Sequence, residues 1–468
     1  WLLYNTGMVY YYLQRYVESE QLLRKLLQRL PQGEPNPDDI FRSGSYYLSK
    51  TLQRQGRLEE AERVLQQATI AVEQHFARDS IDYAELLLEQ AGLAISQGEA
   101  TGITDALQRA LTAFEAVPQA KEFGESSYGF FLTLVDRLIA HCERTDHWEL
   151  VLAARELELP FNEAFLDDQP WIMAIERQWL ADARLVVAAT AEQRKLLHRL
   201  REVTEELDDG AQHGYVDFTP LPANEETKLV DACCEVLGDN NLPVAEFRKA
   251  LVAYWEHQQQ YRKAVTLQEY VFETFYKLFG DDHPYPARAG VVIGRLARKI
   301  GGYQLAKQVL DISLPVLHRI SGEHNDDTLV GNLELAKLHV ATADYAAALP
   351  LALEVERQYG GVWGKTNRVY SDTLETLGMI YLGMNEPALA AENFSRARDV
   401  LKDLGATSDQ RWLRASGFLA IAQAGESNDR AAIREMFDSV LSLYRETNQT
   451  QLVDYAELLL AYADVLTG

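Results

Sequence analysis

The residues that most suggest chemistry lie in the stretch YGGVWGKTN, at positions 359–367. Its Gly364-Lys365-Thr366 string looks like the end of a P-loop, in which backbone N–H groups and a lysine hold the phosphates of a nucleotide. A P-loop also needs an earlier glycine, a preceding strand and a following helix. Position 359 is a tyrosine, and the preceding segment has a helical pattern. We therefore expect an ordinary loop here and no nucleotide site.

A second candidate is the string GDDHP at 280–284, in which Asp281, Asp282 and His283 could ligate a metal ion. Consecutive residues of one turn seldom converge on one ion, because metal sites take ligands at helical or loop spacings. Aspartate also favours the position that caps a helix N-terminus, and proline favours the first helical turn. We expect an aspartate cap followed by a helix, and no metal.

The three cysteines give no site either. Cys142 stands alone, and the adjacent Cys233 and Cys234 point in different directions on a helix. We expect reduced, buried thiols in a reducing compartment, the cytoplasm. The sequence contains no nucleophile elbow, zinc-protease or kinase string. We predict that the chain is not an enzyme and has no catalytic residue, metal or cofactor.

The composition narrows the class of protein. Hydrophobic residues make up 47% of the chain, and the residues that favour helices dominate. The formal net charge of −25 would repel a phosphate backbone, so we expect no nucleic acid partner. No apolar run approaches the roughly 18 residues of a membrane span, and no signal peptide is visible. Because the chain starts at Trp1, it could be part of a larger polypeptide or complex.

A 42-residue period runs through the second half of the chain. It separates five alanines in similar short segments, namely Ala264, Ala306, Ala348, Ala390 and Ala432. The residue twelve positions before each alanine is small in four of the five cases. A small residue that faces an alanine lets two antiparallel helices approach closely. The pattern predicts a repeated helix–turn–helix unit.

The period also explains YGGVWGKTN. Gly364 lies one period after Gly322 and two periods after Gly280, so all three glycines occupy the same loop between units. The N-terminal part has the same spacing between Ser19 and Ala61, and the following units drift to a slightly longer spacing. This drift indicates an eroded array.

The segment after residue 207 interrupts the period. Positions 208–222 are rich in Gly, Pro and polar residues, which is typical of a linker. We therefore expect an N-terminal array with degenerate later repeats at 1–207, a linker at 208–222, and a regular C-terminal array at 223–468.

The repeated unit resembles the tetratricopeptide repeat. Residues 4–31 carry its small and aromatic positions, with Gly7 and Tyr10 on the first helix, and residues 374–397 match again. The 42-residue period and the loop FGDDHPYPA at 279–287 resemble the kinesin-light-chain subtype. The resemblance covers roughly residues 1–160 and 244–468. It implies an all-α, right-handed superhelical solenoid of antiparallel helix pairs.

Such a solenoid would bind partners on its concave side, which the first helices of successive units line. Basic residues recur there in a chain that is otherwise acidic, and apolar neighbours would supply burial. The predicted contact residues are Arg288, Arg295, Arg298, Lys299, Lys337, Arg414, Val291, Leu333 and Met379. Arginines form forked hydrogen bonds with carboxylates, so this basic track predicts a groove for an acidic or C-terminal peptide. The alternative is that these cations pair with acids of the same chain.

Aromatic residues at the N-terminus form another candidate surface. Tyr4, Met8, Tyr11 and Tyr12 lie along one broad face of the first predicted helix. They would either anchor a partner or pack against a neighbouring helix.

We therefore expect a non-catalytic scaffold that binds a partner protein or peptide on the concave face of the solenoid. The alternative is the sensor or regulatory region of a larger signalling enzyme, since similar arrays are attached to ATPase switches, kinases and caspase-like proteases. Sequence alone leaves both open, because such repeats serve many proteins.

Overall fold

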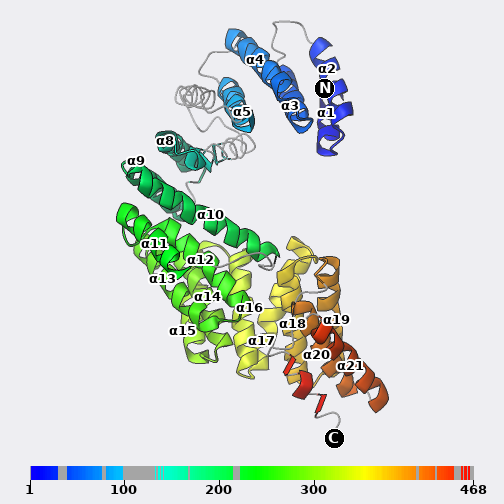
Figure 1. Ribbon diagram of the computed structural model, residues 1–468. Helices are drawn as coiled ribbons and strands as arrows, with labels where there is room; N and C mark the ends of the chain where they lie inside the picture. The colour runs from blue at the N-terminus through cyan, green and yellow to red at the C-terminus, as the bar shows by residue number, and fades with distance from the viewer. Residues whose placement is uncertain are drawn as a thin grey trace. The chain divides into compact units, whose positions relative to one another are not determined.

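The computed structural model describes the residues 2–29, 40–75, 81–97, 132, 135–136, 139–140, 142–166, 169–213, 222–406, 410–426, 429–446, 455–456, 458–460 and 462–463. Within these ranges every regular element is a helix and none is a strand (Figure 1). The predicted all-α fold of helix pairs is confirmed. Among the described helices, none is long and apolar enough to cross a membrane.

The chain divides into two compact units, one of Trp1–Val203 with Pro220–Val244 and the other of Thr204–Thr219 with Ala245–Gly468. The helices that begin in unit 1 are α1 (Leu2–Tyr12), α2 (Tyr16–Arg29), α3 (Ile40–Arg54), α4 (Leu58–His75), α5 (Ile81–Gln97), α8 (Trp148–Phe165), α9 (Pro170–Val187), α10 (Ala191–His213), α11 (Ala223–Leu237) and α12 (Leu242–His257). Because α10 continues to His213, residues 208–213 of the expected linker are helical. The division into arrays at 1–207 and 223–468 stays a prediction.

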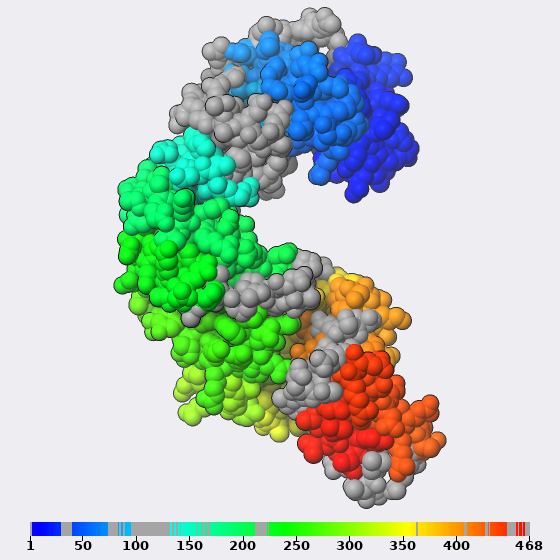
Figure 2. All heavy atoms as spheres, viewed as in Figure 1, coloured from blue at the N-terminus to red at the C-terminus, as the bar shows by residue number. Residues whose placement is uncertain are grey.

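The remaining helices of unit 2 keep the 42-residue period. They are α13 (Tyr261–Phe279), α14 (Pro284–Lys299), α15 (Tyr303–Ile320), α16 (Asp326–Ala341), α17 (Tyr345–Gln358), η2 (Tyr359–Trp363), α18 (Arg368–Gly383), α19 (Pro387–Asp403), α20 (Gln410–Glu426) and α21 (Arg430–Glu446). The first helices α14, α16, α18 and α20 begin one period apart, and so do the second helices α13, α15, α17 and α19. In the space-filling view, the atoms of this unit follow chain order from one pair to the next (Figure 2).

The turns recur in the same register because the backbone must leave each helix in the same way. Loop glycines with φ between +82° and +89° end the second helices, at Gly238, Gly280, Gly322 and Gly364. Glycine reaches this left-handed region without steric cost. The phase inferred from the loop glycines is therefore confirmed.

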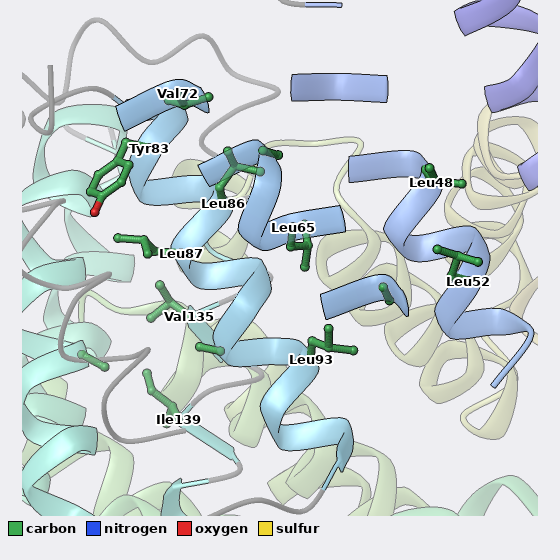
Figure 3. Packing of buried hydrophobic residues seen from close by; sticks show 14 of the residues in the cluster. Leu48, Leu52, Leu65, Val72, Tyr83, Leu86, Leu87, Leu93, Val135 and Ile139 are labelled. Atoms are coloured by element: carbon green, nitrogen blue, oxygen red, sulfur yellow. The ribbon is translucent and has the colours of Figure 1, made fainter. Parts of the chain in front are cut away.

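Close packing within a pair depends on the small residues. A Cβ atom on Gly378 would lie 2.6 Å from Phe394 Cε1, and a Cβ on Gly294 would lie 2.8 Å from Leu310 Cγ. The side chain that fills the space is thus four residues beyond the periodic alanine, while Ala306 and Ala390 are themselves fully buried. In unit 1, leucines and valines of α3, α4 and α5 pack in the same manner (Figure 3).

Candidate functional site

The stretch YGGVWGKTN has the structure of a repeat junction. Tyr359–Trp363 form one turn of π-helix that continues α17, a helical turn that the sequence did not predict. Gly364 then turns the chain, and the Asn367 side chain caps α18 by accepting a hydrogen bond of 2.7 Å from the Tyr370 N–H. Lys365 is exposed beside these residues. No strand precedes the glycine, so the stretch lacks the frame of a phosphate-binding loop.

The string GDDHP caps a helix, but the capping residue differs from the expected aspartate. His283 Nδ1 accepts a hydrogen bond of 3.1 Å from the Tyr285 N–H, while the exposed Asp282 pairs with Arg319 of the next second helix. The asparagines Asn241, Asn325 and Asn367 cap the equivalent helices at the same register. Histidine takes this position here because only its side chain reaches back to the first free N–H. Among the described residues, no group of acids, histidines and cysteines is placed to hold a metal.

The predicted basic residues all lie on first helices of unit 2, and each is paired with an acid. We call the resulting network the ion-pair ladder, and its members are Glu256, Arg288, Arg295, Arg298, Lys299, Asp327, Glu334, Lys337, Asp372, Glu375, Arg411 and Arg414. The free basic track expected from the sequence is therefore corrected. The intramolecular pairing that we kept as an alternative is what the structure contains.

The ladder joins each first helix to the next. Glu256 of α12 lies 2.8 Å from the Arg295 guanidinium and 3.1 Å from the Lys299 amine, both on α14. Arg298 of α14 reaches Glu334 of α16 at 3.0 Å.

The same kind of contact continues toward the C-terminus. Arg288 of α14 lies 2.5 Å from Asp327, and Lys337 of α16 lies 3.7 Å from Asp372 of α18. Arg414 of α20 lies 2.8 Å from Glu375 of α18. Every junction between successive first helices from α12 to α20 thus contains an ion pair.

Glu334 is the most buried carboxylate of the ladder, with 4% of its side chain exposed. Burial alone would raise the pKa of this carboxyl, but the charges of Lys337, Arg298 and Arg295 outweigh it and hold the pKa far below its usual range. Burial likewise opposes ionisation of Glu256, and its two cations again prevail and lower its pKa. These carboxylates stay charged because cations surround them.

The cations lie nearer to solvent than the acids. In each pair of the ladder the cation is more exposed than its acid, except in the pair of Lys337 with Asp372. Arg414 retains 31% of its side-chain exposure while Glu375 retains 9%. The ladder has seven cations and five carboxylates, a net charge of +2 on a chain whose net charge is −25. A weakly positive face therefore covers a layer of carboxylates.

The apolar residues predicted to contact a partner are mostly in the core. Val291 and Leu333 are 4% and 2% exposed and pack between helices, so they cannot offer burial to a ligand. Met379 is half-buried against Phe394 and its neighbours. The helical pattern placed these side chains on the first helices, but not on the correct face.

Sequence reasoning missed the acids of the ladder, although their spacing was visible. Glu256 lies one period before Arg298, and Glu334 lies three residues before Lys337. An acid and a base at one register of consecutive units are close in a solenoid. That signal could have predicted the pairing.

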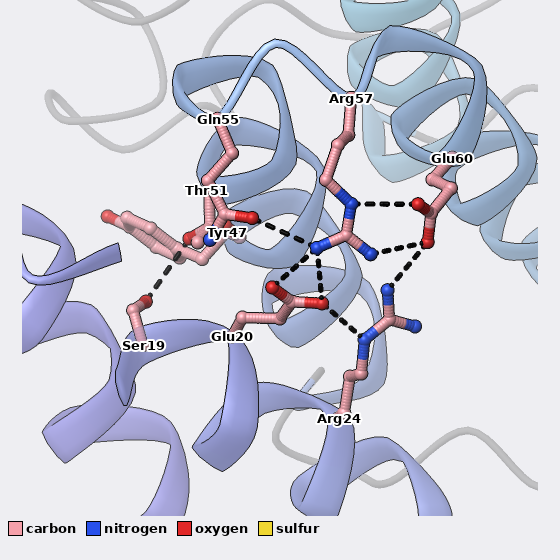
Figure 4. Close-up of polar contacts among 8 residues, drawn as sticks. All are labelled: Ser19, Glu20, Arg24, Tyr47, Thr51, Gln55, Arg57 and Glu60. Carbon is pink, nitrogen blue, oxygen red and sulfur yellow. Dashed lines mark hydrogen bonds and ion pairs between the residues drawn. The ribbon is translucent and has the colours of Figure 1, made fainter. Parts of the chain in front are cut away.

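Unit 1 contains a second network of charges, on its second helices. Arg57 is hydrogen-bonded to Glu20 of α2 at 2.7 Å and to Glu60 of α4 at 2.7 Å, and Arg24 also binds both carboxylates (Figure 4). These side chains are partly exposed, and each cation faces two acids. The network joins the first two repeats and leaves no excess of positive charge.

Residues 47–82, which run from α3 through α4 into α5, match the family model for the tetratricopeptide repeat. The chain contains a tetratricopeptide repeat. The other described helix pairs repeat this arrangement, which confirms the resemblance of the sequence to tetratricopeptide-repeat arrays. No curated protein matches the chain by sequence.

Solved structures of tetratricopeptide-repeat proteins are similar to this chain at low identity. The TPR-like repeats of a kinesin light chain from Podosopora anserina are 17% identical over 44% of this chain and 98% of that chain, with a TM-score of 0.36. BtubC from P. vanneervenii is 14% identical over 60% and 92%, with a TM-score of 0.31. A signal transduction ATPase with numerous domains from Pyrococcus horikoshii, which has a tetratricopeptide repeat sensor, is 10% identical over 96% and 74%, with a TM-score of 0.43. These similarities are too low to transfer a function.

Proposed function

We propose that the chain is a non-catalytic scaffold that binds a protein or peptide on the face formed by the first helices of unit 2. Tetratricopeptide repeats present such a face as a preformed surface, so binding does not have to order the protein. The observation that supports this site is the ion-pair ladder, whose cations lie above their acids. A reducing compartment such as the cytoplasm suits the three unpaired cysteines.

An acidic segment is the partner chemistry that fits this face best. Arginine carries five N–H donors, and a single carboxylate uses at most two of them in forked geometry. The arginines of the ladder can therefore bind a carboxylate of the partner while they keep their own acids. Most of the attraction would come from partly solvated charges, so we expect binding to weaken as salt rises.

Two double variants test this function. Lys299→Gln with Arg414→Gln removes two cations from the ladder, and Lys277→Gln with Lys307→Gln removes two from the exposed side of second helices. Both change the net charge equally. Proteins captured from an extract by the unmodified chain are then purified, and their affinities for the three chains are measured.

We expect the ladder variant to lose at least about tenfold in affinity for a captured partner, and the control variant to keep it. Equal affinity for both variants would contradict the proposed face. Circular dichroism of each variant shows whether the helices are retained.

The alternative role is that of a sensor or regulatory region in a larger signalling enzyme. It would use the same face, with the bound partner controlling an attached catalytic domain. The full-length gene product decides between the two roles, because the alternative fails if no catalytic domain is encoded.

A further inference from the structure

Tyrosines gather on the first helices of unit 1. The Tyr47 ring of α3 lies between 5.8 and 6.1 Å from the rings of Tyr4, Tyr11 and Tyr12 on α1. The hydroxyl groups of Tyr12 and Tyr47 are hydrogen-bonded at 3.1 Å. With Arg54 of α3, whose guanidinium is hydrogen-bonded to the Tyr11 hydroxyl, these residues form what we call the tyrosine face.

The tyrosine face is ordered and still accessible. Tyr12 is 66% exposed, while the other three rings are half-buried and hold one another edge to face. Edge-to-face contacts fix the rings, and a tyrosine has only two side-chain torsions to lose on binding. Of the two roles expected for the N-terminal aromatics, the exposure of Tyr12 favours an anchor.

The tyrosine face occupies the positions that the ladder occupies in unit 2. Tyr12, Arg54 and Lys299 each lie seven residues before the periodic small residue of their own second helix. Lys50 and Arg295 each lie eleven residues before it. The same side of the first helices is therefore aromatic in unit 1 and charged in unit 2.

The charge of this face comes from Arg54. Lys50 is neutralised by Glu89, which is 2.8 Å away and almost fully buried. Within the part of the chain that the structure describes, no carboxylate lies within ion-pair distance of Arg54, and the neutral Tyr11 hydroxyl is its hydrogen-bond partner. Arg54 therefore offers a positive charge and several N–H donors beside four aromatic rings.

We propose that the tyrosine face binds an extended, proline-rich segment of a partner protein that carries a carboxylate beside its prolines. A polyproline II helix has no internal hydrogen bonds, so its carbonyl oxygens can accept hydrogen bonds from tyrosine hydroxyls and from Arg54. Its rings pack on aromatic side chains, and the preformed helix loses little entropy on binding. The carboxylate complements the unneutralised charge of Arg54.

This site is independent of the ion-pair ladder. A bound α-helix would have satisfied its own carbonyl groups and would leave the hydroxyl and guanidinium donors of the tyrosine face unused. For this reason we favour the extended segment, and a helical ligand is an outcome of the test.

The test uses the full chain and fluorescent peptides in anisotropy titrations. The probe is a proline-rich peptide with one central glutamate. The comparison peptides carry glutamine in its place, glycine and serine in place of the prolines, or an alanine-rich helix with the same glutamate. We expect the first peptide to bind most tightly and the peptide without prolines to lose at least about tenfold.

The protein variants are Tyr12→Ala and Arg54→Gln, with Tyr276→Ala as a matched control. Tyr276 is 48% exposed on α13 and lies outside the tyrosine face. We expect about tenfold weaker binding for Tyr12→Ala, and for Arg54→Gln we expect the preference for glutamate over glutamine to disappear. The control and the Lys299→Gln, Arg414→Gln variant should bind the peptide as the unmodified chain does.

The proposal is overturned if the unmodified chain does not bind the proline-rich peptide, or binds the peptide without prolines or the helical peptide equally well. Unchanged binding by Tyr12→Ala would also overturn it. Because the ladder variant leaves the tyrosine face intact, failure of this proposal and failure of the proposed function give different results.

Discussion

The guanidinium of Arg298 lies 3.0 Å from the carboxylate of Glu334, and the two residues belong to the first helices of successive repeats. Lys337 binds the same carboxylate at 3.0 Å from within α16. One buried acid therefore joins α14 to α16 while the cations stay nearer to solvent. The ladder thus holds neighbouring repeats together on the face that we propose for binding.

Replacing Glu334 with glutamine should destabilise unit 2. The change leaves Arg298 and Lys337, which are both only 19% exposed, without the carboxylate that they share. Removing one partner of a buried pair costs about 3 kcal/mol, because a buried charge is left uncompensated. Denaturant unfolding measures the loss. The control is Asp311→Asn, which breaks an exposed pair with Lys307 and should cost less than about 1 kcal/mol.

Stability of unit 1 should fall as the pH rises from 5 to 8. Burial raises the pKa of Asp182 to about 6 and that of Glu158 to about 7. Their folded values lie above their ordinary ones, so their contribution is fully present below about pH 4 and is lost as the pH rises through the folded pKa.

Asp182→Asn isolates this effect. The variant should be more stable than the unmodified chain at pH 8, by on the order of 2 kcal/mol, and the difference should shrink at pH 5. Denaturant unfolding at the two pH values measures it. A variant that is equally destabilised at both values would show that the carboxylate does not titrate in this range.

Gly378→Ala should destabilise unit 2 by about 1–3 kcal/mol through overpacking. The new methyl group would meet the fully buried ring of Phe394, which has no free space in which to move. Gly92→Ala in α5 is the control, since a Cβ there meets no atom within 4 Å. It should stabilise its helix by about 0.5–1 kcal/mol, because alanine favours the helix more than glycine does. Thermal unfolding of the two variants should therefore shift in opposite directions.

The stretch YGGVWGKTN should matter for folding and not for nucleotide binding. Gly364 has a φ of +82°, so Gly364→Ala should cost about 1–2 kcal/mol. Lys365→Ala should leave stability unchanged, because this side chain is exposed. Calorimetric titration with ATP should give no binding. Binding of ATP that Lys365→Ala abolishes would restore the phosphate-loop hypothesis.

Much of the fold followed from the sequence because backbone constraints repeat with the chain. A loop glycine and a periodic alanine recur wherever a helix must end or another helix must come close, and Gly322 and Ala348 lie where the period predicts. His283 as a cap was not predictable in this way, since the residue that caps depends on which side chain reaches the free N–H.

The candidate site was less predictable than the fold. Arg295 and Lys337 share one register of the period, but their partners Glu256 and Glu334 lie at other registers. Pairing depends on distances across repeats, which the period indicates only when acids and bases are compared together. The apolar pattern likewise could not separate the core side of a first helix from its open side, as Val291 illustrates.

The most direct test of the central claim is site-specific photo-crosslinking. Ala253 is exposed on α12 and lies one period before Arg295, so it reports on the first-helix face without breaking an ion pair. Gln308 is exposed on the second helix α15 and serves as the control. A photoreactive amino acid is placed at each position in turn, and proteins attached after illumination in an extract are separated by mass. We predict discrete protein adducts from position 253 that are absent from position 308, and adducts from position 308 alone, or equally from both, would contradict the account.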